Sequence, residues 1–359
     1  MRDLSSLQRL GWTDFFQEQL AGDPPAQPVA RVVEEQRGAY RIAGDVQGWA
    51  EVSGRFRHDA HTPSDFPAVG DWVCVTASTG GERALITRRL DRRSTISRKA
   101  AGRVVEEQVV AANVDTIFLV TALSEDLNPR SIERYLTVVR EAGAVPVVIL
   151  NKTDLSQDPE GQSAGLRARL PFVDVLAVSA RNAEGLDALN AYLVPAQTVA
   201  LIGSSGVGKS TLVNRLLGED RLKTAATREA DGKGRHTTTS RNLVELPGGA
   251  LLIDTPGMRE LQPWVEESAV AETFDDIVAL ASGCRFNDCA HLAEPGCAVL
   301  LAVEQKTLDA DRLEHYRHLG REIAFEERKR DKSAAAEQKR RWKKIHQEQK
   351  KIYRDRDRS

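Results

Sequence analysis

The nine residues GSSGVGKST at 203–211 have the types and spacing to bind a chain of phosphates. They fit the pattern G-x-x-x-x-G-K-[ST], in which backbone N–H groups surround phosphate oxygens and glycines allow a close approach. Lys209 would neutralise charge between the β- and γ-phosphates, and the Ser210 hydroxyl would bind Mg²⁺. The alternative is a glycine-rich turn that binds nothing. The phosphate contacts that we expect come from Gly203, Ser204, Ser205, Gly206, Val207, Gly208, Lys209, Ser210 and Thr211.

A second motif, DTPG at 254–257, closes the apolar run that begins at residue 250. There the Asp254 carboxylate could reach the magnesium ion, directly or through water, and the Gly257 N–H could meet the γ-phosphate. The polar segment 228–240 lies between the two motifs and is expected to be ordered by γ-phosphate and Mg²⁺. Of its three consecutive threonines we choose Thr238 as the magnesium ligand. Taken alone, DTPG is also a plausible turn.

The tetrapeptide NKTD at 151–154 follows the apolar run VPVVIL and could recognise a guanine base. The Asp154 carboxylate can accept hydrogen bonds from guanine N1–H and from the 2-amino group, a pair of donors that adenine lacks. Asn151 would hold the loop, and the stem of Lys152 would lie over the base. Four residues can match by chance, but VSA at 178–180 ends the next apolar run, where Ser179 and Ala180 can supply backbone contacts to the base. The full expected base site is Asn151, Lys152, Thr153, Asp154, Ser179 and Ala180.

A cluster of soft ligands lies in the segment CRFNDCAHLAEPGC, which supplies Cys284, Cys289, His291 and Cys297. Three thiolates and an imidazole suit tetrahedral Zn²⁺ with no open position, which would make the site structural. A chance cluster of buried thiols is the alternative. The remaining cysteine, Cys74, is expected in a buried strand.

The elements that must position these residues are indicated by hydrophobic periodicity. Short alternating runs from residue 30 to 96, separated by Gly, Pro and Asp turns, predict a small antiparallel β-barrel of OB-fold or SH3-like type. From residue 114 apolar runs alternate with helical patterns, which predicts a mainly parallel sheet. Ligands bind at the carboxyl ends of such strands, where every nucleotide motif falls. The predicted domains are a lead-in at 1–29, an OB-fold-like barrel at 30–100, an α/β domain at 101–262, a helical metal-binding domain at 263–325 and a basic tail at 326–359.

The overall composition narrows the class of protein. The chain has 359 residues, 41% of them hydrophobic, and a formal net charge of −2, which suits a globular protein of two or three domains. The first residues contain neither a secretory signal nor a transmembrane run, so we expect a cytoplasmic protein without membrane contact. We also expect a monomer. Residues 325–359 carry 14 Lys/Arg against 7 Asp/Glu. Such a tail could attract nucleic acid, or could be a solvated helix.

The order of the motifs is reversed relative to ordinary nucleotide switches, because the base-reading loop comes before the phosphate loop. The series NKTD, SA, phosphate loop and DTPG resembles the circularly permuted GTPases, and within them the ribosome small-subunit-dependent GTPase family, RsgA. The resemblance runs from about residue 30 to about residue 300. It implies an N-terminal OB-fold, a permuted GTPase domain and a C-terminal zinc domain. It also implies hydrolysis of GTP to GDP and phosphate, stimulation by the small (30S) ribosomal subunit, rRNA contacts from the barrel and the zinc domain, and a role in late maturation of that subunit.

The residue that would orient the attacking water is not the usual one. Many GTPases have a glutamine directly after the DTxG turn, but this chain has Met258, which cannot hold water. A nearby polar candidate is His236, and the resemblance implies a water-positioning role for it. Two other functions stay open: an RNA-binding assembly protein with a vestigial nucleotide site, and a metabolic phosphate-loop kinase, against which NKTD argues.

Overall fold

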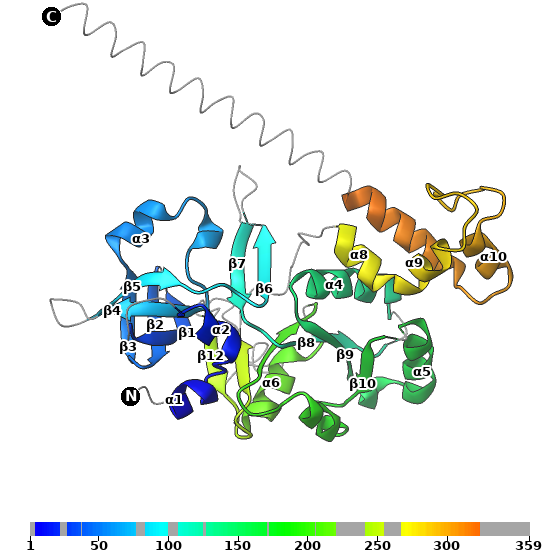
Figure 1. Ribbon diagram of the computed structural model, residues 1–359. Coiled ribbons are helices and arrows are strands. Elements are labelled where there is room, and N and C mark those ends of the chain that lie inside the picture. Colours follow the sequence, from blue (N-terminus) through cyan, green and yellow to red (C-terminus); the bar gives the residue numbers. More distant parts are fainter. Residues whose placement is uncertain are drawn as a thin grey trace, which may run out of the picture. The chain divides into compact units, whose positions relative to one another are not determined.

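The computed structural model of the chain describes residues 4–21, 27–36, 38–76, 83–99, 107–124, 127–170, 172–204, 206–219, 241–254 and 267–323. It consists of two compact units, Met1–Trp264 and Val265–Ser359, whose elements are labelled in Figure 1. In these ranges no helix is both long enough and apolar enough to cross a lipid bilayer.

Five strands of the first unit form a closed barrel. They are β1 (Val29–Gln36), β2 (Ala39–Gly44), β3 (Gly48–Val52), β4 (Trp72–Thr76) and β5 (Ala84–Arg89). Their order is β1-β2-β3-β5-β4, and β4 pairs again with β1. The helix α3 (Gly54–Asp59) and the 3₁₀ turn η1 (Pro63–Asp65) lie between β3 and β4. The barrel confirms the OB-like prediction, with one correction: β3 and β5 are parallel, so the barrel is not wholly antiparallel.

The barrel has an apolar interior because alternate side chains of each strand point inward. Its buried residues include Val32, Ile42, Val73 and Ile86. Cys74 in β4 is fully buried, as expected. The N-terminal helices α1 (Leu4–Arg9) and α2 (Asp14–Glu18) cover another part of the barrel. The side chains that form this second cluster are Leu7, Trp12, Phe16, Val29, Trp72, Cys74 and Leu90.

The nucleotide motifs lie on a mainly parallel sheet, as predicted. Its strands are β8 (Thr116–Ala122), β9 (Val145–Asn151), β10 (Asp174–Ala177), β11 (Thr198–Ile202), β12 (Arg241–Glu245) and β13 (Leu251–Asp254). The order is β10-β9-β8-β11-β13-β12, in which β12 alone is antiparallel to its neighbour. The helices that connect the strands are α4 (Pro129–Glu141), α5 (Pro159–Arg169) and α6 (Lys209–Leu217). Two shorter turns, η2 (Thr153–Leu155) and η3 (Leu186–Ala191), are 3₁₀ helices.

Barrel and α/β sheet are joined by hydrogen-bonded strands. β1 pairs antiparallel with β12, with Glu34 opposite Asn242 and Glu35 opposite Arg241. The described strands therefore form one 11-stranded sheet that runs from β10 to β4. A separate hairpin is formed by β6 (Thr95–Lys99) and β7 (Glu107–Ala112). Because β6 pairs with β7, the domain boundary that we placed at residue 100 cuts through this hairpin; the boundaries themselves stay predictions.

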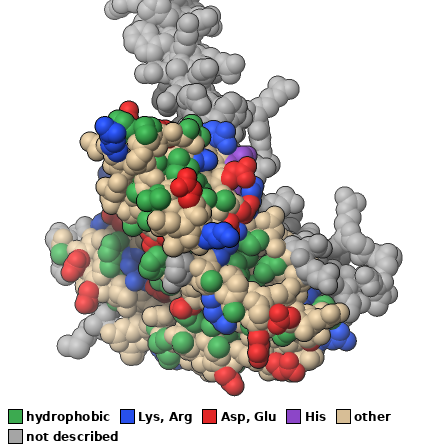
Figure 2. All heavy atoms as spheres, turned by 90° about the vertical axis from the view of Figure 1, so that its right-hand side faces the viewer, with side chains coloured by type: hydrophobic (Ala, Val, Ile, Leu, Met, Phe, Trp, Pro, Cys, Tyr) green, Lys and Arg blue, Asp and Glu red, His purple; other side chains and the backbone are tan. Residues whose placement is uncertain are grey.

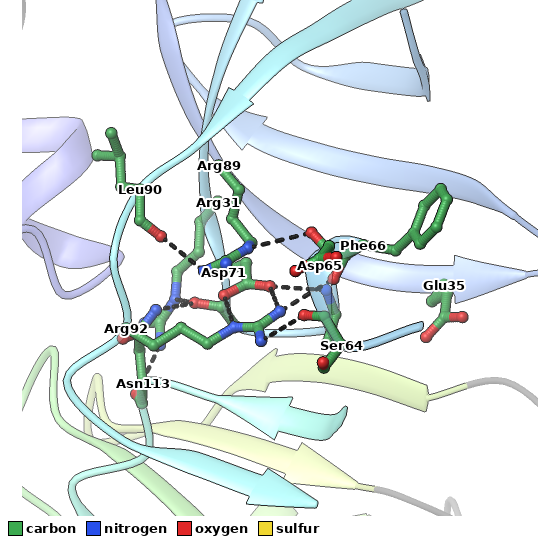
Figure 3. A network of polar contacts seen from close by, with 12 residues as sticks. Arg31, Glu35, Ser64, Asp65, Phe66, Asp71, Arg89, Leu90, Arg92 and Asn113 are labelled. Carbon is green, nitrogen blue, oxygen red and sulfur yellow. Dashed lines mark hydrogen bonds and ion pairs between the residues drawn. The ribbon is translucent and has the colours of Figure 1, made fainter. Parts of the chain in front are cut away.

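A buried arginine reinforces this junction (Figure 3). The Arg31 guanidinium, on β1, donates to the backbone carbonyls of Leu10 (2.6 Å), Gly70 (3.1 Å) and Asn113 (3.0 Å). Burial lowers the pKa of Arg31 to about 10. Beside it the buried Asp71 carboxylate accepts a hydrogen bond of 2.8 Å from Arg92 Nε and another of 2.7 Å from Arg92 Nη2. Three segments that are distant in sequence are thus tied to one side chain.

The second unit is helical, as predicted for the region after residue 264. It contains α8 (Glu267–Thr273), α9 (Asp275–Ala281), α10 (Ala298–Glu304) and a helix at 310–323. The last helix is held to α9 by Arg312, which donates two hydrogen bonds of 2.8 Å to Asp276. Phe274 is fully buried and packs against the rings of His315 and Tyr316. The predicted basic tail lies outside the described residues.

Candidate nucleotide site and metal centre

Four loops that carry the sequence motifs follow four parallel strands at one edge of the sheet. Gly203 follows β11, Asn151 ends β9, Ser179 comes two residues after β10, and Asp254 ends β13. Since parallel strands end on the same side, the topology brings the motifs to one edge although their order along the chain is permuted.

The phosphate loop has the close contacts that require glycine. At Gly203, where φ is +143°, a Cβ atom would lie 2.0 Å from the Val120 carbonyl oxygen. At Gly208, where φ is +97°, it would lie 2.2 Å from Asn151 Nδ2. Lys209 Nζ donates to the carbonyl oxygens of Gly203 (2.7 Å) and Ser204 (2.5 Å). The loop is therefore a tight cradle with its cation directed inward.

Asn151 joins the base-reading loop to the phosphate loop. Its Nδ2 donates to the Val207 carbonyl at 2.8 Å, and its Oδ1 accepts from the Ala180 N–H at 3.0 Å. The side chain is buried, so these hydrogen bonds are shielded from water. Three of the expected segments are thus connected by one amide, in the loop-holding role expected for this residue.

The Asp154 carboxylate is oriented by a neighbouring hydroxyl. Ser179 Oγ donates to Asp154 Oδ1 at 2.6 Å and accepts from the Asn182 N–H at 3.2 Å. Ser179 is fully buried. Lys152 has a left-handed backbone with φ of +67°, which is uncommon outside glycine and typical of functional loops. Sequence reasoning assigned Ser179 only backbone contacts, so the role of its hydroxyl was missed.

A further residue that sequence reasoning missed is Arg215, on α6. Its Nε donates to the Ala180 carbonyl at 3.0 Å and its Nη2 to the Arg181 carbonyl at 2.8 Å. The guanidinium therefore fastens the loop after β10 to the helix that follows the phosphate loop. No motif marks this residue, because an arginine inside a helix is unremarkable by pattern.

Of the three candidate magnesium ligands, the structure describes Ser210 and Asp254. Ser210 is the second residue of α6, and Asp254 ends β13 opposite Asn242 of β12. Both offer hard oxygen atoms, the ligand type that Mg²⁺ prefers. Thr211 lies in the first turn of α6, and Gly206 precedes it in the loop. The remaining predicted residues, Ser205, His236, Thr238 and Gly257, lie outside the described residues.

The second unit brings the four expected metal ligands together. Cys284 Sγ lies 3.7 Å from Cys297 Sγ and 3.6 Å from His291 Nδ1, which is itself 3.4 Å from Cys297 Sγ. With Cys289 included, all ligand atoms lie within 4.8 Å of one another. Tetrahedral zinc with Zn–S bonds of about 2.3 Å places its sulfur ligands about 3.8 Å apart. The cluster therefore has the spacing of a closed four-ligand metal site.

Backbone N–H groups support the thiolates. Burial would raise the pKa of Cys284, but the hydrogen bonds from the N–H groups of Val299 and Ala298 and from the side chains of Cys297 and Cys289 together lower it, and the net shift is downward. Cys297 Sγ accepts from the Leu300 N–H at 3.4 Å. Burial raises the pKa of Cys289 to about 11 and lowers the pKa of His291, which favours the neutral imidazole that binds metals.

Comparisons with known proteins agree with this geometry. The model of the RsgA GTPase family matches residues 89–264. The small ribosomal subunit biogenesis GTPase RsgA of Opitutus terrae is 48% identical over 96% of this chain and 97% of its own length. A protein named RsgA 2 from Lactiplantibacillus plantarum is 44% identical over 89% of this chain and 90% of its own.

Two solved structures share the fold. YjeQ from Thermotoga maritima superimposes with a TM-score of 0.64 at 25% identity, over 83% of this chain and 98% of its own. YloQ, described as a circularly permuted GTPase, superimposes with a TM-score of 0.60 at 24% identity, over 85% of this chain and 98% of its own. The motifs lie at the strand ends in permuted order, and one relative is 48% identical over 96% of this chain. The chain therefore belongs to the RsgA family of circularly permuted GTPases.

Proposed function

We propose that this chain binds GTP at the carboxyl edge of its parallel sheet and hydrolyses it to GDP and phosphate during biogenesis of the small ribosomal subunit. The observation that carries the proposal is the pair of hydrogen bonds of the Asn151 amide, which donates to Val207 O and accepts from the Ala180 N–H and so holds the base-reading loop against the phosphate loop. Family membership supports the reaction, and the names of the relatives support the small subunit as the place of action.

Each described part of the site has a distinct task in this proposal. Asp154 accepts from guanine N1–H and from the 2-amino group, held in position by Ser179. Lys209 exchanges its two carbonyl contacts for phosphate oxygens when nucleotide enters. Ser210 and Asp254 would hold Mg²⁺. When bound, that ion neutralises charge that develops on the phosphate oxygens.

For hydrolysis we propose His236 as the group that orients the attacking water, since Met258 follows the DTPG turn. We expect the substitution His236→Ala to lower turnover with little change in nucleotide affinity. The measurement is single-turnover GTP hydrolysis beside equilibrium binding of GDP. Unchanged turnover would remove the assignment, as would an equal loss of binding.

For the cluster Cys284, Cys289, His291 and Cys297 we propose one structural Zn²⁺ per chain. The donor set of three sulfurs and one imidazole, at tetrahedral spacing, is the support. Two large apolar side chains of the loop 284–297, those of Phe286 and Leu292, are exposed and add little to its packing. The metal would therefore supply much of its folding free energy.

The ribosomal partner is also a proposal. Barrel and zinc-binding unit would contact rRNA, the small subunit would stimulate hydrolysis, and the protein would act in the cytoplasm as a monomer. The alternative is an RNA-binding assembly protein with a vestigial nucleotide site. Against it stands the intact hydrogen bonding of the base-reading loop. In the view of Figure 2, the described Lys and Arg side chains are scattered among acidic and hydrophobic ones, so this face does not distinguish between the two functions.

The deciding experiment measures phosphate release from GTP and from ATP, with and without isolated small ribosomal subunits. We expect turnover of GTP alone, with an increase when small subunits are added. If no phosphate were released under any condition, the alternative with a vestigial nucleotide site would be favoured. Equal hydrolysis of ATP and GTP would contradict the proposed role of Asp154. Transfer of phosphate to a small molecule would favour a metabolic kinase.

A further inference from the structure

Strand β12 is held at each of its two ends by an ion pair with the N-terminal part of the chain. At its first residue, Arg241 Nη1 lies 3.1 Å from Glu35 Oε2 of barrel strand β1. At its last residue, Glu245 Oε1 lies 3.0 Å from Arg9 Nη2 of α1. The side chains of Arg241 and Glu35 are 12% and 25% exposed, whereas those of Arg9 and Glu245 are 73% and 43% exposed. Because water screens the Arg9–Glu245 pair more strongly, we expect the Arg241–Glu35 pair to contribute more to holding β12 in place.

The two pairs also differ in their distance from the nucleotide edge. Asn242 lies opposite Asp254 of β13 on one side and opposite Glu34 of β1 on the other. Neighbouring strands are about 4.8 Å apart, so the barrel backbone lies about 10 Å from the backbone of the candidate magnesium ligand. Glu35 and Arg241 form the next residue pair along β1 and β12, directly beside Glu34 and Asn242. Glu245, in contrast, lies opposite Leu251, at the far end of β13.

Backbone pairing alone gives the start of β12 little support from the barrel. Two residue pairs join β1 to β12, Glu34 with Asn242 and Glu35 with Arg241. Because this backbone contact is short, a considerable part of the stability of the β1–β12 contact depends on the ion pair between Glu35 and Arg241. β1 itself is firmly fixed, because Arg31, four residues before Glu35, donates to three backbone carbonyls. Figure 3 shows Arg31 and one of these partners, Asn113.

We propose that Glu35 is a positioning residue for the nucleotide site: by holding Arg241, it fixes the start of β12 and through it the position of Asp254. One strand of the barrel is thereby a structural part of the magnesium site. This inference rests on the proposed function, in which Asp254 holds Mg²⁺.

The test uses the full chain and measures how fast a fluorescent, non-hydrolysable GTP analogue is released at increasing Mg²⁺. In the wild type, we expect Mg²⁺ to slow release with a definite midpoint concentration. We expect Glu35→Gln to raise that midpoint by about three- to ten-fold, as fits the loss of one half-buried ion pair. Without Mg²⁺, release should match the wild type, because Glu35 touches neither the phosphate loop nor the base-reading loop. Arg241→Gln should behave in the same way.

The matched control is Arg9→Gln, which removes the ion pair at the other end of the same strand and should leave the midpoint unchanged. Glu35→Arg alone should also raise the midpoint. The double variant Glu35→Arg with Arg241→Glu, in which the two charges are exchanged, should bring the midpoint back toward the wild-type value. Three results would overturn the inference: a wild-type midpoint in Glu35→Gln, an equal shift in Arg9→Gln, or no recovery in the double variant. If the wild type itself showed no response to Mg²⁺, the proposed magnesium site would fail, and the inference with it.

Discussion

Ser179 Oγ donates a hydrogen bond of 2.6 Å to Asp154 Oδ1, so the buried hydroxyl of the loop after β10 orients the carboxylate of the loop after β9. Ser179→Ala would leave that carboxylate free to rotate and would remove one charge-assisted hydrogen bond. We expect GDP affinity to fall by about 10-fold, with kcat for GTP little changed at saturation. Calorimetric titration with GDP measures the effect, and unaltered affinity would show that the hydroxyl does not orient the base reader.

The base preference should follow the chemistry at residue 154. Asp154→Asn replaces one carboxylate oxygen by an N–H₂ donor, which no longer matches the guanine 2-amino group. Xanthine carries a carbonyl oxygen at that position, so the variant should bind XDP in preference to GDP. Competition between the two nucleotides on wild type and variant measures the change. A variant that still prefers GDP would contradict the proposed contact.

Glycine should be indispensable at the end of the phosphate loop. Gly208→Ala would place a methyl group 2.2 Å from Asn151 Nδ2, at a backbone φ of +97°. We expect nucleotide binding to weaken by more than about 100-fold, because the change displaces both joined loops. Gly218→Ala is the control, since φ is +70° there and nothing lies within 4 Å of the added atom. Equal losses in both variants would point to general strain rather than to the loop contact.

Metal removal should unfold the loop between α9 and α10. We expect elemental analysis to detect one zinc per chain in the wild type and none after chelation or in Cys297→Ser, and we expect the helical circular dichroism of the second unit to fall with the loss of the metal. Re-addition of Zn²⁺ should restore the chelated protein but not the variant. Cys74→Ala, which removes the cysteine of the barrel, should keep one zinc per chain. A wild-type protein without zinc would defeat the assignment.

The buried guanidinium at the junction should carry measurable stability. Arg31→Met would leave the carbonyls of Leu10 and Asn113 without this donor, while Gly70 O would still accept from Asn113 Nδ2 at 3.0 Å. We expect the free energy of unfolding to fall by about 2–4 kcal/mol. Denaturant unfolding measures it, with Arg41→Met, at an arginine side chain that is 61% exposed, as the control. Equal stability of the two variants would show that the network is incidental.

The motifs and their strand-end placement could be predicted because they depend on local order. In the run 145–150, the four consecutive residues 147–150 are all buried, although neighbouring side chains of a strand point to opposite faces. The apolar composition therefore shows where the strand ends and the loop begins. The ligands of the metal site could be predicted for a similar reason, since all four lie within 14 consecutive residues.

The rest depends on partners that periodicity does not reveal. Alternation predicts that β3 and β5 are strands, but not that they run parallel, and nothing in β12 indicates that β1 covers its edge. Arg31 looks like a surface residue until three distant carbonyls surround it. The segment GLDALNAYL has helical spacing, yet residues 186–191 form a tighter 3₁₀ turn.

The packing of α1 and α2 bears on how the protein can be shortened. Leu7, Trp12 and Phe16 cover Trp72, and the Leu10 carbonyl is a partner of Arg31. A recombinant fragment that started at β1 would expose a tryptophan and strip a buried cation of one acceptor, although all five barrel strands were present. Such a truncation should aggregate, and the minimal folding unit of the barrel therefore starts at the first helix.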